Sequence, residues 1–173
     1  PRIEGNWHRK GMVMGNVQSG KTLNYIGLIN KAADVGYKTF ILIGGHMNDL
    51  RKQTQERIDQ GFIGKASKHL RDNFDYDINV GVGTFRHEDD VNYLTSTESD
   101  FNSRVASATG ISLRSDIPTI FVVKKNTKIL ENLYKWIKEN HSLDPESHIR
   151  LKSQLMFIDD EADYATPNSK ASR

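Results

Sequence analysis

The 173-residue chain contains no cysteine, only 4 prolines and 2 tryptophans, and no long apolar run. Without cysteine there are no disulfides and no thiolate ligands for zinc, and the 6 histidines lack the H-x₃₋₅-H spacing of a zinc site. A membrane-spanning helix needs about 20 apolar residues, and no segment approaches that length. No secretory signal peptide is visible either. These absences predict a cytoplasmic protein with no membrane partner.

The net charge and the length of the chain limit the class of partner and the number of domains. The formal net charge is +2, so no overall basic character requires a nucleic-acid partner. Hydrophobic residues make up 36% of the chain, which suits a globular protein with a core. We expect residues 1–173 to form one domain. Because the first residue is Pro1 and not methionine, we also expect the chain to be a piece of a longer protein.

One segment matches the phosphate-loop pattern G-x-x-x-x-G-K-[ST] at every fixed position. Its residues are Gly15, Asn16, Val17, Gln18, Ser19, Gly20, Lys21 and Thr22. In such a loop the backbone N–H groups point inward at phosphate oxygens, while the lysine reaches the β- and γ-phosphates and the Thr hydroxyl binds Mg²⁺. A helix that starts here adds the positive end of its dipole. The segment therefore predicts binding of a nucleoside triphosphate with Mg²⁺.

The pattern of apolar residues predicts alternating strands and helices. The expected strands are short apolar runs at residues 11–14, 38–43, 78–82, 118–123 and 155–158. The expected helices cover residues 22–35, 48–60 and 127–140; the second is polar and reads as solvent-facing, capped by Asn48 or Asp49 and ended by Gly61. Residues 84–116 read as irregular or partly helical. This alternation predicts an α/β fold with a mainly parallel central sheet covered on both faces.

Acidic residues follow the last expected strand directly. A carboxylate at that position can hold the Mg²⁺ that bridges the β- and γ-phosphates, and a second one can orient and deprotonate the attacking water. We assign Asp160 to the metal and Glu161 to the water, although the register could instead put Asp159 on the metal and Asp160 on the water. Together with Lys21, these residues predict an ATPase site at the carboxyl ends of the strands.

The two motifs together resemble known families. Residues 160–163, Asp-Glu-Ala-Asp, are the string that names the DEAD class of superfamily-two helicases, and with residues 20–22 they look like the first of two RecA-like motor domains. With residues 122–126 added, the chain resembles more closely the Z-one (endonuclease-associated) domain family of prokaryotic restriction- and defence-linked ATPases. This resemblance spans residues 11–168 and favours Asp160 and Glu161 as the acidic pair. It implies a P-loop NTPase of the RecA-like three-layer type.

The resemblance also implies partners. It implies coupling to DNA, a second RecA-like domain of the same protein, and nuclease or methyltransferase partners in a prokaryotic restriction or defence system. The candidate DNA contacts follow two strands: Lys124, Lys125, Asn126 and Arg51, with His46, Asn48 and Gln53 beside Arg51. Two cations and a helix start at residues 124–126 suit phosphate, although a capped helix with solvated lysines explains them equally well. Since the second domain would supply an arginine finger, we expect the chain alone to bind nucleotide but hydrolyse it weakly.

Other functions fit the residues less well or stay open. A small-molecule kinase usually has a lid with arginines and lacks an Asp-Glu pair after a late strand. A GTPase reads guanine with Asn-Lys-x-Asp, and residues 126–129 do not match it. No nuclease pattern of the form P-D…(D/E)-x-K is evident, so we expect no nuclease activity from this segment. An ATP-binding sensor or scaffold without motor activity remains an alternative, because both motifs can persist for binding alone.

Overall fold

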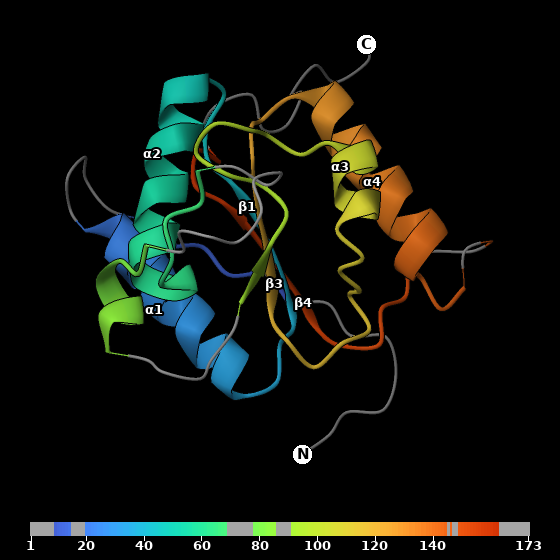
Figure 1. Ribbon diagram of the computed structural model, residues 1–173, viewed down its shortest axis with the longest axis horizontal. Helices are drawn as coiled ribbons and strands as arrows, with labels where there is room; N and C mark the ends of the chain where they lie inside the picture. The colour runs from blue at the N-terminus through green and yellow to red at the C-terminus, as the bar shows by residue number, and fades with distance from the viewer. Residues whose placement is uncertain are drawn as a thin grey trace, which may run out of the picture.

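The structure is a computed structural model, and it describes residues 9–14, 20–68, 78–85, 91–144, 146 and 149–162. Helices pack on both faces of a central sheet, so the fold is α/β with three layers (Figure 1). The elements are α1 (Lys21–Asp34), β1 (Thr39–Ile43), α2 (Asn48–Ile58), the π-helix η1 (Asp59–Ile63), the 3₁₀-helix η2 (Gly81–Thr84), β2 (Asn92–Tyr93), α3 (Ser103–Ala108), β3 (Thr119–Val123), α4 (Thr127–His141) and β4 (Leu155–Asp159).

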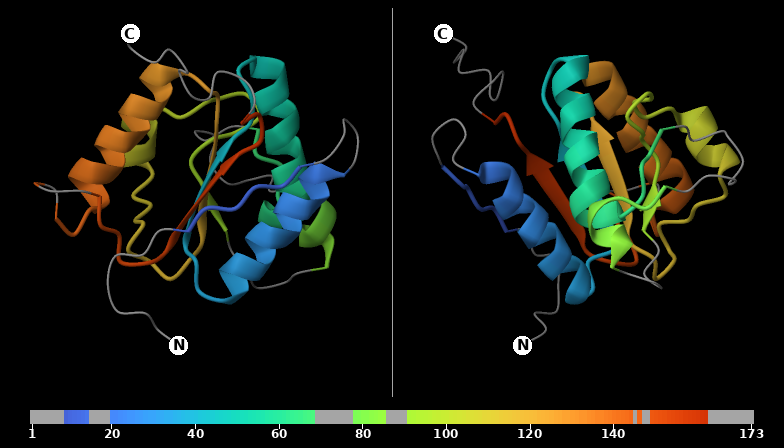
Figure 2. Two further views of the ribbon diagram at one scale, coloured as in Figure 1. Left: turned by 180° about the vertical axis from the view of Figure 1, so that it is seen from behind. Right: turned by 60° about the vertical axis from the view of Figure 1, so that its left-hand side comes forward.

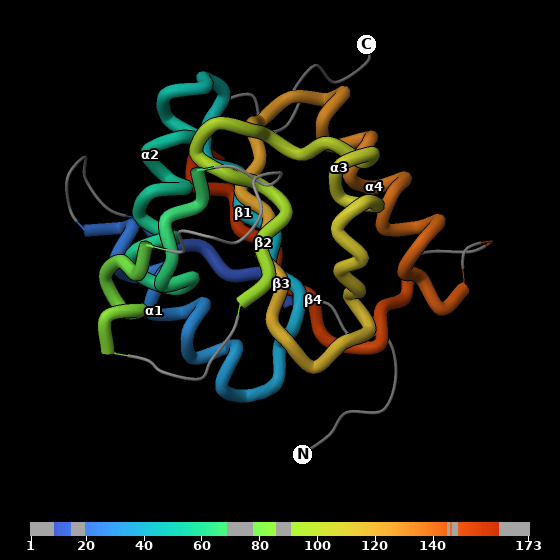
Figure 3. Tube along the Cα trace, viewed as in Figure 1, coloured from blue at the N-terminus to red at the C-terminus, as the bar shows by residue number. Residues whose placement is uncertain are grey.

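Among the described residues the sheet has four strands, all parallel, in the order β2-β3-β1-β4 (Figure 3). In its register Ile41 of β1 lies opposite both Phe121 of β3 and Phe157 of β4. β1 and β3 are buried along their whole length, which explains why their sequences are uninterrupted apolar runs. β4 pairs with β1 on one side, and its residues Leu155 and Phe157 are 37% and 54% exposed. Within the part of the chain that the structure describes, β4 is therefore an edge strand.

Alternate residues of β1 enter two separate cores, because successive strand residues point to opposite faces of a sheet. Phe40 and Leu42 pack against α1 and η1 on one face, and Ile41 and Ile43 pack against α3 and α4 on the other, where Trp136 is buried. Figure 2 shows α1 and α2 on one side of the sheet and α3 and α4 on the other. Both faces of the sheet are thus covered, and the carboxyl ends of β1, β3 and β4 open at one common edge.

Most predicted elements are confirmed, with ends shifted by one or two residues. The helices expected at 22–35 and 127–140 are α1 and α4, and the strands expected at 38–43, 118–123 and 155–158 are β1, β3 and β4. The irregular or partly helical character expected for residues 84–116 agrees with their described part, which contains the last residue of η2 and the short β2 and α3. The α/β class with a parallel sheet is therefore confirmed.

Two predicted strands are wrong. Residues 11–14 form no strand, and Met12 and Met14 are each 81% exposed. So short an apolar run carries too little periodicity to distinguish a buried strand from exposed chain. Residues 78–82 contribute only an isolated antiparallel bridge, between Asn79 and Lys65, before η2 begins. The glycines at 81 and 83 allow the chain to turn there instead of extending.

The helix predicted at residues 48–60 is present as α2, but the prediction that it faces solvent is wrong. α2 buries four residues, three of them polar: Arg51, Thr54, Gln55 and Ile58. The helix does not end at Gly61 but continues as the π-helix η1 to Ile63. At its other end, the residue before α2 is Met47, which gives no side-chain cap, so neither Asn48 nor Asp49 is the cap. Polar side chains can be buried when partners satisfy them. Those partners come from distant segments that a local pattern does not contain.

Backbone packs directly on backbone between η1 and η2. A Cβ on Gly83 would overlap the carbonyl oxygen of Gly64, and a Cβ on Gly81 would overlap the carbonyl oxygen of Gln60. Val80 donates a backbone hydrogen bond of 2.9 Å to Gly64 in the same contact. Glycine is therefore required at these positions by close approach, and not only by turn conformation.

We predict that Gly83→Ala lowers the free energy of unfolding by about 1–3 kcal/mol, because the added methyl group must displace backbone that has no room to move. Urea denaturation measures the change. Gly27→Ala is the matched control, since a Cβ at Gly27 in α1 meets nothing within 4 Å. Alanine is the better helix former there, so the control should be neutral or slightly stabilising. Equal stability of Gly83→Ala and the unsubstituted protein would contradict the packing described.

Candidate nucleotide site

A large cleft opens at the carboxyl edge of the sheet. Its volume is about 1280 Å³, and its walls come from the start of α1, from α2, from η1 and η2, and from the segments after β1 and β4. Lys21 and Thr22 of the predicted phosphate loop line it together with Asp160 and Glu161. Residues 15–19 of the predicted loop and Asp163 lie outside the described residues. The structure thus brings the described part of the first motif and the acidic pair into one cavity.

Tyr25 joins the two motifs directly. Its hydroxyl donates a hydrogen bond of 3.2 Å to Oδ2 of Asp160, across a separation of 135 positions in the sequence. Burial, and then the charge of Asp160, raise the pKa of Tyr25 to about 12, so the phenol stays protonated and able to donate at neutral pH. Burial also raises the pKa of Asp160, while the hydrogen bond from Tyr25 and the charge of Lys21 act in the opposite direction. Sequence reasoning missed Tyr25, although it lies one helical turn after Thr22.

Glu161 is held by the segment that follows β1. Its Oε2 lies 3.1 Å from Nδ1 of His46, and both side chains are about one-third exposed, at 32% and 33%. Gly45, with φ of 100°, leaves the space that a side chain would take, since an added Cβ would meet Leu50 at 2.9 Å and the Glu161 carboxyl carbon at 3.5 Å. His46, a candidate DNA contact, therefore contacts Glu161 of the acidic pair and can orient the Glu161 carboxylate.

The predicted DNA contacts at 124–126 take different positions. Lys125 turns inward: its Nζ donates to Oδ2 of Asp159 at 2.9 Å and to the carbonyl of Glu161 at 2.8 Å. It thus holds the turn that carries the acidic pair. Lys124 donates through Nζ to Asn48 Oδ1 at 2.9 Å. Asn126 caps α4 by accepting a hydrogen bond from the Ile129 N–H, as its position before the helix allows.

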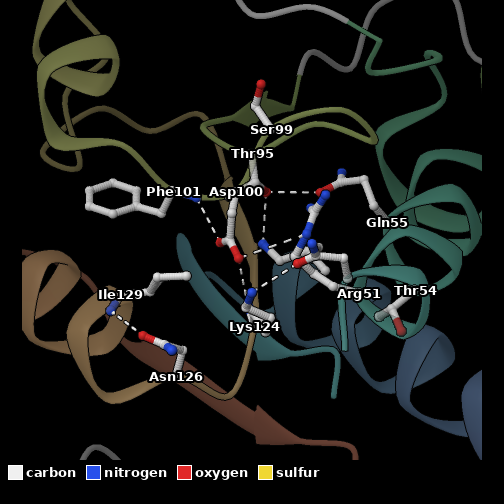
Figure 4. Close-up of polar contacts among 12 residues, drawn as sticks. Arg51, Thr54, Gln55, Thr95, Ser99, Asp100, Phe101, Lys124, Asn126 and Ile129 are labelled. Carbon is white, nitrogen blue, oxygen red and sulfur yellow. Dashed lines mark hydrogen bonds and ion pairs between the residues drawn. The ribbon is translucent and has the colours of Figure 1, made fainter. Parts of the chain in front are cut away.

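Arg51 lies inside a buried polar network (Figure 4). It is 4% exposed and donates to the carbonyls of Ser96 and Thr97 at 2.8 and 3.0 Å. Its Nε lies 3.8 Å from Oδ2 of Asp100, which also accepts from the backbone N–H of Lys124 at 3.1 Å. Burial lowers the pKa of Arg51 and raises that of Asp100. In this position Arg51 supports the fold, and its burial argues against the DNA contact suggested by the sequence.

Gln55 extends the same network to the sheet. It accepts a hydrogen bond of 2.9 Å from the Thr95 hydroxyl, and Thr95 accepts one of 2.8 Å from the Val122 N–H of β3. Its amide donates to Asp59, whose carboxylate also accepts from Ser67. The segment 94–100, α2 and β3 are therefore held together by hydrogen bonds beneath the cleft.

Arg57 is a second residue that sequence reasoning missed. It projects from α2 into the cleft and donates a hydrogen bond of 3.1 Å through Nη1 to the Thr22 hydroxyl. No local pattern marks it, because the contact spans 35 positions of the sequence.

The oxygen atoms in the cleft suit magnesium. Mg²⁺ prefers hard oxygen ligands and is usually held by one or two protein groups together with substrate phosphates and water. The Thr22 hydroxyl and the Asp160 carboxylate, which both line the cleft, provide such ligands. Across the residues that the structure describes, no group of three or more His, Asp or Glu side chains could hold a metal. The residues therefore fit Mg²⁺ carried in with a nucleotide better than a metal caged by the protein alone.

Comparison with protein-family models, curated proteins and solved structures finds no match for the chain. Among the described residues, no helix is long and apolar enough to cross a membrane.

Proposed function

We propose that this chain binds ATP with Mg²⁺ and hydrolyses it, as a P-loop NTPase domain of the RecA-like type. The observation that carries the proposal is the cleft shared by Lys21, Thr22, Asp160 and Glu161. Two sequence motifs from opposite ends of the chain line one cavity, and each is the type of group that the other needs for phosphoryl transfer. Two solvated surface motifs would have no reason to share a cavity.

Each residue has a distinct task in this proposal. Lys21 neutralises charge on the β- and γ-phosphates, and the N–H groups at the start of α1 add to that field. Thr22 and Asp160 would hold the metal, whose charge would offset that of the phosphates. Glu161 orients and deprotonates the attacking water, with His46 fixing the position of its carboxylate. Tyr25 keeps Asp160 directed at the metal position.

We further propose that the domain is the motor part of a DNA-dependent, helicase-like ATPase in a prokaryotic restriction or defence protein. The supporting evidence is the resemblance of residues 15–22, 122–126 and 158–163 to the Z-one family. Lys124 is the remaining basic candidate for a phosphate contact, since Lys125 and Arg51 are engaged inside the protein. An ATP-binding scaffold is the alternative, and the two differ in whether DNA stimulates phosphate release.

Lys21→Ala tests the proposal. We expect it to weaken ATP affinity by about 10- to 100-fold, because a charge-assisted hydrogen bond to phosphate contributes about 1.5–3 kcal/mol. The measurement is a titration with a fluorescent ATP analogue in the presence of Mg²⁺. Lys31→Ala is the matched control, since Lys31 is an exposed cation in the last turn of the same helix. Absence of ATP binding to the unsubstituted chain, or equal affinity of both variants, would refute the proposal.

A further inference from the structure

The cleft contains more carboxylates than the phosphate-loop lysine can balance. Asp160 and Glu161 line it on one side, and a triphosphate would add further negative charge. Among the described residues that line the cleft, Lys21 and Arg57 carry a permanent positive charge. Lys21 alone would balance only one of the two carboxylates, so the second cation, Arg57, has an electrostatic reason to be there.

Arg57 lies on a part of α2 whose backbone is held in place by buried neighbours. Its neighbours along the chain, Ile58 and Asp59, are 0% and 3% exposed, so the backbone at this position is fixed by the core. The side chain itself is exposed and reaches Oγ1 of Thr22 at 3.1 Å. Its charge also acts on Asp160 and on Tyr25, which places the guanidinium near the acidic wall as well. The guanidinium thus contacts a residue of the first motif and acts electrostatically on a residue of the second.

Other cations of α2 have different surroundings. Arg51 is buried against backbone carbonyls, and Lys52 forms an exposed ion pair of 3.1 Å with Glu98. Arg57 differs from both because the atom it contacts is the hydroxyl at the start of α1, where the phosphates of a bound nucleotide would meet the helix. A planar guanidinium can bind phosphate oxygens through two parallel N–H groups, which suits it to this position.

We propose that Arg57 is a nucleotide-binding residue that contacts the terminal phosphate of a bound nucleoside triphosphate, from the α2 side of the cleft. This inference rests on the proposed function and deepens it. In phosphoryl-transfer sites of this type the residues that hold the metal lie close to the terminal phosphate, and here those residues would be Thr22 and Asp160. A guanidinium near these residues distinguishes a triphosphate from a diphosphate. Arg57 therefore makes the site selective for the state of the nucleotide before hydrolysis.

The test compares affinities for fluorescent ATP and ADP analogues, with and without Mg²⁺, in Arg57→Ala and Arg57→Lys. We expect Arg57→Ala to weaken ATP binding by about 10-fold or more and ADP binding by less than about threefold, because only ATP has the terminal phosphate. Arg57→Lys should recover part of the ATP affinity, since it restores the charge without the planar fork. Lys52→Ala, an exposed cation of the same helix, should change neither affinity.

Each result has a defined meaning. Unchanged ATP affinity in Arg57→Ala, or an equal loss for ATP and ADP, would overturn the inference. If at the same time Lys21→Ala loses ATP binding, the proposed function stands and only the role of Arg57 fails. If the unsubstituted chain binds neither nucleotide, the proposed function itself fails. Because the Arg57 side chain is exposed, its variants should unfold at the same urea concentration as the unsubstituted chain.

Discussion

Glu161→Gln should slow ATP hydrolysis by about 10²- to 10⁴-fold while ATP affinity stays within about threefold, because glutamine keeps the shape of the side chain but cannot accept a proton. The carboxylate lies 3.1 Å from His46, and Lys125 holds its backbone carbonyl, so the substituted side chain should keep its position. Loss of turnover with retained binding is the result that separates a general base from a residue needed only for affinity.

Phosphate release by the protein, with and without double-stranded DNA, measures this effect, and the fluorescent titration measures affinity. Glu98→Gln is the matched control, since Glu98 is an exposed carboxylate paired with Lys52. Turnover that is unchanged in Glu161→Gln would rule out the role in water activation. Turnover that DNA does not stimulate would favour the ATP-binding scaffold over the motor.

The second large effect concerns stability. Arg51→Met should lower the free energy of unfolding by about 3–5 kcal/mol, the usual result of removing one partner from a buried ion pair. Methionine keeps the apolar stem of the side chain but leaves the Asp100 carboxylate and the carbonyls of Ser96 and Thr97 without the guanidinium. Since small domains have a total stability of about 5–15 kcal/mol, a loss of this size is a large fraction of it.

Urea denaturation followed by circular dichroism measures the change. Lys52→Met is the matched control, because Lys52 is the next residue of α2 and its ion pair with Glu98 is exposed, at 45% and 51%. Exposed pairs contribute about 0–1 kcal/mol, so the control should remain close to the unsubstituted protein. Equal destabilisation by the two substitutions would show that the buried network does not support the fold as described.

The elements that the sequence predicted correctly are those decided by local patterns. β1 and β3 are buried on both faces, so each appears as an unbroken apolar run, and α4 has its apolar residues at helical spacing. The run at residues 11–14 looked similar but is exposed. Being apolar is therefore not sufficient for a strand, since burial also requires neighbours that the run itself does not specify.

The errors come from contacts between distant segments. α2 read as solvent-facing because its residues are polar, yet Gln55 and Arg51 are buried by partners 40 and 45 positions away. The segment at 78–82 read as a strand, but its backbone packs against Gln60 and Gly64. In the cleft, Lys21 and Asp160 belong to recognisable motifs and were found, whereas Arg57 belongs to none.

The position of β4 at the edge of the described sheet affects the site that it carries. Its backbone pairs with β1 along one side, whereas β1 itself is paired along both. Local opening of a fold is easiest where few backbone hydrogen bonds and few apolar contacts must break. The acidic half of the cleft therefore follows an edge strand, while Lys21 and Thr22 start a helix packed on the core. Binding a nucleotide across the cleft would join the two halves, so ligand binding and closure of this edge would stabilise each other.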